Sequence, residues 1–359
     1  MRVLLTIIIT LLLIFSPSVY AAEEQNNGGD DNSFDITEMI MSHIGDSHEF
    51  HIVNIPRKDK EDIKLTIPLP IILWYDGGLH IFSSSKIYDN EVVESRGSHF
   101  LLNDEKIYVT DEYGHLSYNE ESEITNTKPF DISITKNVAT MFLAVITILL
   151  LAISAGRIYK QSNTHSAPKG TQRILEPVVI FVRDEIINTN IEKGKADFFA
   201  PFLLTLFLFI WISNLLGVIP FFPGGANLSG NIAYTLTLAI FAFLATNIFG
   251  SKAYWKEILT APGAPIYVKI FLVPIEIIGM FTKPFALMLR LFANITAGHI
   301  IILSLASIIF VLETIYASPL TILLSLIMFT LELLVATLQA YIFTLLTALF
   351  IGMAVKSEH

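Results

Sequence analysis

The sequence contains no cysteine and few charged residues. Asp, Glu, Lys and Arg make up only 16% of its 359 residues, against about 25% in an average soluble protein, whereas 53% are hydrophobic. The missing cysteine excludes a disulfide framework, a thiolate metal site and a cysteine nucleophile. The composition also excludes a disordered chain and a nucleic-acid-binding arm, so no nucleic-acid partner is expected. Because so few polar side chains cannot coat a compact globule, much of the surface must face lipid.

The formal net charge of −10 conceals two parts of opposite character. Residues 23–136 contain 23 acids and 9 bases, a net charge of −14, whereas residues 137–359 contain 10 acids and 13 bases, a net charge of +3. Long apolar runs occur in the second part only. The sequence therefore predicts an acidic region at 23–135 followed by a membrane domain at 136–359.

Residues 1–22 have the pattern of a secretory signal peptide. Met1 and Arg2 precede the apolar run Val3–Phe15, which is short for a membrane span, and small residues before Glu23 suit signal peptidase. Cleavage near Ala22 would place the following residues outside the cytoplasm. An uncleaved membrane anchor is the alternative.

The acidic region is predicted to be a small β-rich head. Three β-prone runs are separated by turn sequences such as Asp76-Gly77-Gly78. These runs are Ile63–Leu73, Leu79–Ser83 and Lys106–Thr110. His43, His48 and His51 have a spacing that would permit metal binding, but we interpret them as solvated histidines in an acidic environment.

Five apolar stretches are long enough to span a bilayer, which favours an all-α polytopic membrane protein. The last two exceed 30 residues, or about 45–55 Å, so they must form a long, tilted C-terminal hairpin in an apolar slab of about 30 Å. The stretches are Asn137–Ala155, Phe198–Ile219, Asn231–Phe249, Thr282–Leu312 and Leu320–Val355. The fold class is therefore about five spanning helices plus the small extracytoplasmic β-rich N-terminal region.

Basic residues set the orientation. Arg157, Lys160, Lys252 and Lys256 follow the first and third spans, so these ends and the C-terminus are expected in the cytoplasm of a multi-pass protein of the inner (plasma) membrane.

Two further segments do not read as simple spans. The segment Thr171–Asn190 has helical periodicity and is expected to lie on the cytoplasmic face. The apolar segment Ile266–Met280 is interrupted by Lys269, Pro274 and Glu276, so we expect a re-entrant or half-crossing segment rather than a clean span.

Arg290 lies inside an apolar span, where a charge costs about 2.5–3.5 kcal/mol even on permissive scales. Asn294 shares its helix face, whereas His299, nine residues on, points to the opposite side. Glu332 and Gln339 are seven residues apart on one face of the last helix. Arg290 could instead be neutralised inside the bundle or reach the interface, and Gln339 could serve only to hydrogen-bond between helices.

These residues resemble a known family. Leu289-Arg290-Leu291-Phe292-Ala293-Asn294 with Ala297-Gly298-His299 is similar to the signature helix of subunit a of the F-type ATP synthase membrane sector. The segments Thr337–Phe343 and Ser213–Gly217 resemble its final helix and an earlier span. The resemblance covers residues 136–357 and excludes the acidic head.

The resemblance implies a function and its residues. Arg290 matches the arginine that faces the rotating ring of c subunits and separates two proton half-channels, and Gln339 matches a glutamine that packs near it. The implied ion-path residues are Glu276, Asn294, His299, Glu332 and Asn214, of which Glu276, His299 and Glu332 would line the outside-facing half-channel. In some members the acid and the histidine stand in the reverse order. The implied partners are the c-subunit ring, the b-subunit peripheral stalk and the remainder of the ATP synthase, and no cofactor, nucleotide or metal site is expected.

Two other classes of function compete with this one. In an ion-coupled secondary transporter a buried arginine would bind an anionic substrate, but such folds usually contain internal repeats, and none relates the first spans to the last two. In a membrane-anchored sensor the acidic head would bind a ligand and the spans would serve only as an anchor.

Overall fold

The structure is a computed structural model that describes residues 45–55, 63–88, 91–120, 123–161, 170–219, 224–263, 265–311 and 318–356. The predicted signal peptide, His43 and the side chain of His51 lie outside this description. Contacts divide the described chain into two units. The first ends at Lys136 and includes the described part of 303–324, and the second comprises the described parts of 137–302 and 325–359. We call residues 45–136 the head.

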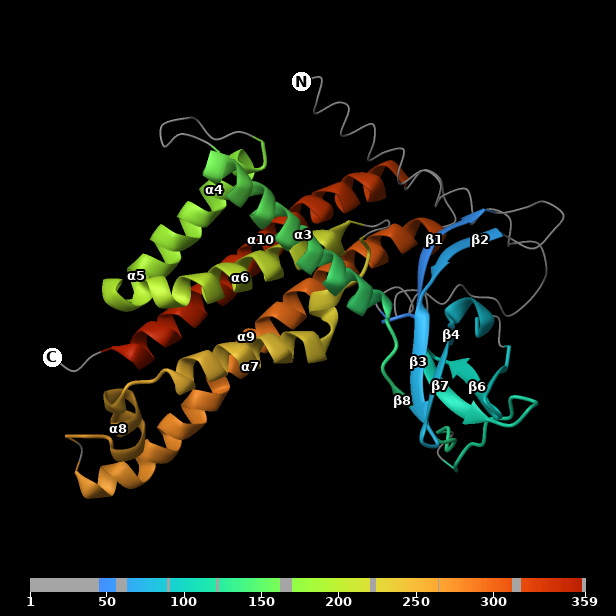
Figure 1. Ribbon diagram of the computed structural model, residues 1–359, viewed down its shortest axis with the longest axis horizontal. Coiled ribbons are helices and arrows are strands. Elements are labelled where there is room, and N and C mark those ends of the chain that lie inside the picture. Colours follow the sequence, from blue (N-terminus) through green and yellow to red (C-terminus); the bar gives the residue numbers. More distant parts are fainter. Residues whose placement is uncertain are drawn as a thin grey trace. The chain divides into compact units, whose positions relative to one another are not determined.

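In the described part of the head, eight strands form three small antiparallel sheets, which confirms the predicted β-rich region (Figure 1). The core between them is built from Ile71, Leu73, Ile87, Val93, Phe100 and Ile107. Strand β1 (Glu49–Ile55) pairs with β2 (Ile63–Pro68), β3 (Pro70–Tyr75) lies between β4 (Gly78–Ser83) and β8 (Phe130–Asp131), and β6 (Ser98–Asn103) lies between β5 (Val93–Ser95) and β7 (Lys106–Thr110).

The predicted run Ile63–Leu73 is two strands rather than one. Pro68 and Pro70 have no N–H donor, so a continuous ladder across them is impossible and the chain changes sheets at this point. The turn at Asp76-Gly77 is confirmed, with φ of +46° and +70° at its two central residues. Positive φ at both positions matches the right-handed twist of the strands that this turn joins.

His48 is buried, so its interpretation as a solvated histidine was wrong. Its exposed fraction is 2%, its Nε2 lies 3.2 Å from Asp131 Oδ2, and its backbone N–H donates to the Tyr88 hydroxyl. Burial alone would raise the pKa of Asp131, but hydrogen bonds with His48 and Ser133 hold that pKa below its ordinary value. Among the described residues, no group of three His, Asp or Glu side chains is close enough to hold a metal ion.

The remaining described chain is helical. Four helices are long and apolar enough to cross a membrane, and α7 with α8, bent by 100°, can supply a fifth crossing, which confirms the predicted number of spans (Figure 1). The helices are α3 (Lys136–Gln161), α4 (Gln172–Phe181), the π-helical η2 (Val182–Ile187), α5 (Asn188–Asn190), α6 (Lys193–Val218), α7 (Ile232–Ile248), α8 (Lys252–Thr260), α9 (Ile266–Val311) and α10 (Ser318–Val355), with short 3₁₀ turns at η1 (Ser84–Lys86) and η3 (Leu228–Gly230).

The expectation that Ile266–Met280 is a re-entrant or half-crossing segment was wrong. It is the first part of α9, a continuous helix of 46 residues that contains Pro274 and Pro284. A proline removes only one hydrogen bond, and a helix remains the best way to satisfy the other backbone groups in an apolar environment. At about 1.5 Å per residue α9 is about 69 Å long, and the 38-residue α10 about 57 Å, so both exceed an apolar slab of about 30 Å.

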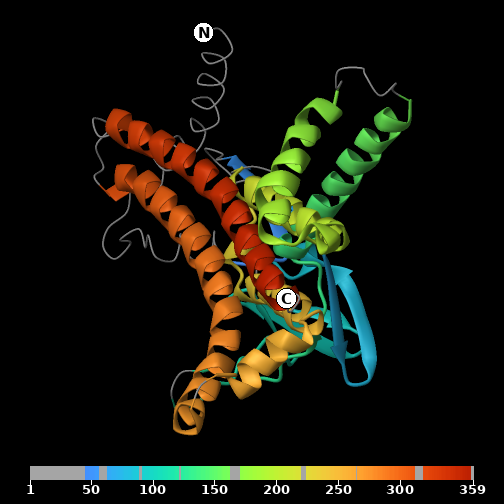
Figure 2. The same cartoon turned by 90° about the vertical axis from the view of Figure 1, so that its left-hand side faces the viewer.

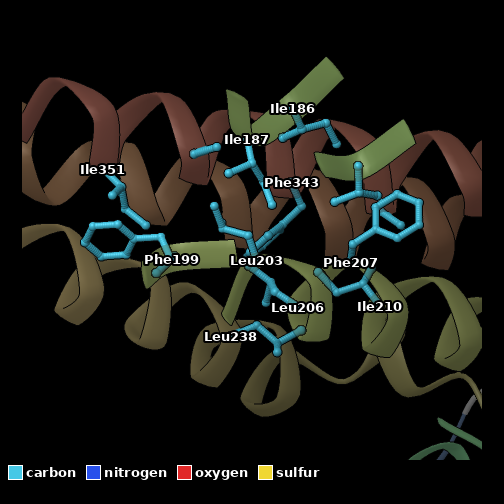
Figure 3. Close-up of a cluster of buried hydrophobic side chains, with 14 of the residues drawn as sticks. Ile186, Ile187, Phe199, Leu203, Leu206, Phe207, Ile210, Leu238, Phe343 and Ile351 are labelled. Carbon is cyan, nitrogen blue, oxygen red and sulfur yellow. The ribbon is translucent and has the colours of Figure 1, made fainter. Parts of the chain in front are cut away.

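The second unit is held together by a core between α6, α10 and the segment α4–η2. Val182, Ile186 and Ile187 of η2 are fully buried, and Figure 3 shows Ile186 and Ile187 beside Phe343 of α10 and Leu203 of α6. The predicted helix at 171–190 is thus helical, although interrupted by a π turn, and its location at the cytoplasmic face stays a prediction.

Candidate functional site

Arg290 occupies the middle of α9. It follows Ile266 by 24 residues and precedes Val311 by 21, which corresponds to about 36 and 31 Å of helix. Its side chain is exposed on the surface of this chain, as are Ala286 and Ala293 one turn away on either side. These small neighbours leave room for another helix to approach the guanidinium closely.

The guanidinium has no acidic partner within 4.0 Å among the residues that the structure describes. From the middle of such a long helix it also cannot reach either end by extending its side chain. Both alternatives from the sequence, neutralisation inside the bundle and escape to the interface, are therefore unsupported by the geometry. A cation in this position calls for an acidic partner, which the described residues do not supply.

His299 and Glu332 form a polar pair between α9 and α10. His299 Nδ1 is hydrogen-bonded to Glu332 Oε1, and only 5% of the Glu332 residue is exposed. Gly298 makes this contact possible, because a Cβ at that position would lie 3.3 Å from Glu332 Oε1. The pair faces α10 while Arg290 and Asn294 lie on the exposed side of α9, as the helical spacing predicts.

Gln339 is buried, with an exposed fraction of 3%, and its level along the hairpin matches that of Arg290. Two contacts define the antiparallel register: the bond between His299 and Glu332, and the Lys283 ammonium 5.5 Å from the centre of the Phe350 ring. Between these contacts, equal steps along α9 and α10 bring Gln339 within about one turn of Arg290. Figure 2 shows the two helices side by side.

Asn214 connects α6 to its neighbours. Its amide Nδ2 donates to the Ala336 carbonyl at 3.2 Å, and its Oδ1 accepts from the Ser229 hydroxyl at 2.5 Å. Because Ala336 precedes Gln339 by three residues, the first of these bonds joins α6 to α10 about one turn from Gln339. Close packing on the same helix favours glycine at position 217, since a Cβ there would lie 3.1 Å from the Ala226 carbonyl oxygen.

Glu276 lies apart from the His299–Glu332 pair. It precedes His299 by 23 residues on α9, a separation of about 34 Å along the helix. It lines a cavity of about 220 Å³ near the C-terminal end of α10, where Phe350 and Met353 form part of the wall. The expectation that Glu276, His299 and Glu332 line one half-channel therefore does not fit the geometry.

Other polar residues in this cavity did not stand out in the sequence. Its wall includes Asn247 and Tyr254, which are hydrogen-bonded to each other at 3.1 Å, as well as Glu257 and Lys283. Glu257 belongs to α8, a short helix in which the sequence drew attention only to the basic residues. A cavity of this size with polar groups in its wall has room for several water molecules, at about 30 Å³ each.

In the part of the chain that the structure describes, two antiparallel apolar helices carry a cation without an acidic partner, with titratable groups on either side of it along their length. This arrangement is typical of an ion-translocating membrane protein. Comparisons with known proteins name the family. The model of the family described as ATP synthase A chain matches residues 138–352, and a model described as Domain of unknown function (DUF8433) matches residues 39–132.

Curated relatives agree. ATP synthase subunit a of Chloroherpeton thalassium is 47% identical over 233 residues, which cover 64% of this chain and 68% of the relative. ATP synthase subunit a 2 of Prosthecochloris aestuarii is 37% identical over 318 residues, or 85% of this chain and 97% of the relative. ATP synthase subunit a of Myxococcus xanthus is 41% identical over 235 residues, or 64% and 75%.

The chain belongs to the family of subunit a of the F-type ATP synthase. It is thus a multi-pass membrane component of the ATP synthase complex and acts in proton transport for ATP synthesis. This membership sets aside the secondary transporter and the membrane-anchored sensor.

Proposed function

We propose that this chain provides two proton half-channels that meet the c-subunit ring at Arg290, and that the b-subunit peripheral stalk holds it in place as a stator. The observation that supports this is the position of Arg290: exposed on this chain, halfway along α9, and without an acidic partner among the described residues. A carboxylate on each passing ring subunit supplies the missing partner.

The guanidinium determines what happens to that carboxylate. It stays charged at any physiological pH and stabilises the ionised form of a nearby acid. A ring acid that reaches Arg290 therefore releases its proton to one half-channel, passes as an anion and takes up a proton from the other. The same fixed positive charge repels a proton that would leak directly between the half-channels.

The two half-channels lie at opposite ends of the hairpin in this proposal. The His299–Glu332 pair serves one, together with Asn294, and the cavity around Glu276 serves the other. The backbone N–H of Ser251 donates to the Ala354 carbonyl at 2.8 Å, so α8 with Lys252 and Lys256 lies at the C-terminal end of α10. These basic residues favour the cytoplasmic side for the Glu276 cavity and the extracytoplasmic side for the pair and for the N-terminal head. Cleavage of residues 1–22 stays a prediction.

Crosslinking tests the ring contact. The chain has no cysteine, so a single cysteine at Ala293, one turn from Arg290, is expected to crosslink to a c subunit in the assembled complex under mild oxidation when a cysteine is placed in the facing ring helix. A cysteine at Leu150, which is 63% exposed on α3, is the matched control and is expected to remain uncrosslinked. Equal crosslinking at both positions, or none at Ala293, would argue against the proposed ring contact.

Glu276→Gln is expected to slow passive proton flow through the membrane sector by at least about tenfold, because a proton relay in the cavity loses its titratable group. Flow is measured by dye quenching in vesicles stripped of the catalytic sector. Glu185→Gln, an exposed acid on η2, is the control and should leave the rate unchanged. A wild-type rate in Glu276→Gln would remove this residue from the path and leave the role of Arg290 open to its own test.

A further inference from the structure

In the part of the head that the structure describes, one face of the β4–β3–β8 sheet carries exposed apolar side chains. Trp74 is 50% exposed, Ile81 61% and Phe130 69%. The register places them together, because Trp74 pairs with Phe130 and Leu79, Ile72 pairs with Ile81, and the Ile132 N–H donates to the Ile72 carbonyl. We call this set the outer face: Ile72, Trp74, Leu79, Ile81, Phe130 and Ile132.

The opposite face of the same sheet already forms the core of the head. Ile71 and Leu73 are fully buried there, and Asp131 faces His48 on that side. An antiparallel sheet with one solvated face normally alternates apolar and polar residues. Here the outward positions of all three strands include no charged side chain. Contiguous exposed apolar surface of this kind marks a binding surface.

Backbone hydrogen bonds tie the residues after β8 to the head as far as the first residue of α3. After β8 the Ile134 N–H donates to the Pro70 carbonyl at 3.1 Å, and the N–H of Lys136, the first residue of α3, donates to the Ser47 carbonyl at 2.8 Å. Ile132 is four residues from the start of α3, so their Cα atoms are at most about 14 Å apart. Since α3 is long and apolar enough to cross a membrane, only a few residues separate the outer face from a candidate membrane span along the chain.

We propose that the outer face rests on the adjacent leaflet of the bilayer, with the rings of Trp74 and Phe130 at the boundary between headgroups and acyl chains. Aromatic rings are enriched at this depth of membranes. Hydrophobic burial must supply the attraction, because residues 23–136 have a net charge of −14 and anionic lipids would repel them. The contact therefore forms on zwitterionic lipid and withstands high salt.

The missing cysteines make this testable on the full chain. Ile81→Cys is labelled with an environment-sensitive fluorophore, and the protein is reconstituted in phosphatidylcholine vesicles in high salt. Glu94→Cys, at an exposed position on β5 outside the outer face, is the control. The expected result at position 81 is a blue-shifted emission, quenching by a lipid-borne nitroxide and loss of quenching by iodide present on both sides of the membrane. The label at position 94 is expected to show the reverse pattern.

Two results would overturn the proposal. Equal iodide quenching at both positions would mean that the outer face stays in water. Protection of position 81 from both quenchers would mean that protein, rather than lipid, covers it.

Discussion

Arg290→Ala is expected to abolish ATP synthesis driven by a proton gradient, since no fixed charge would remain to ionise the ring acid at the meeting point of the half-channels. Each elementary charge that crosses a potential of 100 mV delivers about 2.3 kcal/mol, and without Arg290 this energy is no longer coupled to rotation. The measurement is ATP synthesis in inverted membrane vesicles after an imposed gradient. Assembly of the complex is checked by its retained ATP hydrolysis.

Arg290→Lys distinguishes geometry from charge. An ammonium is a compact point charge that can lose its proton in an apolar environment, whereas a guanidinium stays charged and presents five donors in a plane. We therefore expect the lysine variant to fail as well. Arg173→Ala, an exposed residue on α4, should retain coupling. Wild-type synthesis in either Arg290 variant would refute the proposed role.

The membrane part of this fold is largely predictable from the sequence because lipid imposes simple rules. A bilayer leaves backbone groups no partner but each other, so run length alone identified the spans at 137–155 and 198–219. The same rule explains the error at Ile266–Met280. In water, Pro274 and Glu276 would favour an interrupted helix, because water can hydrogen-bond the freed backbone groups. Lipid cannot, so the helix continues.

The head was less predictable because its key contacts are remote in sequence. His48 is hydrogen-bonded to Asp131, which is 83 residues away in the sequence, and no local sequence pattern predicts a contact at that separation. The exposed outer face likewise depends on strand order, since β8 pairs with β3 although the strands of the third sheet lie between them in the sequence.

The site divides in the same way. The antiparallel hairpin brings His299 and Glu332 together across 33 residues, and the roles proposed for them come from the resemblance to a family. The distance of Glu276 from this pair follows from the rise of a helix, about 1.5 Å per residue, because α9 is continuous. Glu257 could not be found from sequence, because its proximity to Glu276 depends on the bend between α7 and α8.

Substitutions in the His299–Glu332 pair have the second large expected effect. Glu332→Gln is expected to slow proton-driven ATP synthesis by at least about tenfold and to change its pH dependence, because it removes one of the two titratable groups of the pair. His299→Glu alone would bring two carboxylates together on adjacent helices, where they repel each other, and should be at least as harmful.

The double variant His299→Glu with Glu332→His restores one acid and one imidazole at the same contact. Because Gly298 leaves space beside position 332, the exchanged side chains can still meet, and synthesis should recover relative to both single changes. The non-additivity of the double-mutant cycle measures the coupling between the two positions. A pH profile of Glu332→Gln that matches wild type, together with non-additive losses in the cycle, would mean that the pair only joins α9 to α10, and additive losses would remove even that role. A changed pH profile in Glu332→Gln together with a coupled recovery would mean that a proton passes through the pair, since a purely structural bond would give coupling without changing how the rate depends on pH.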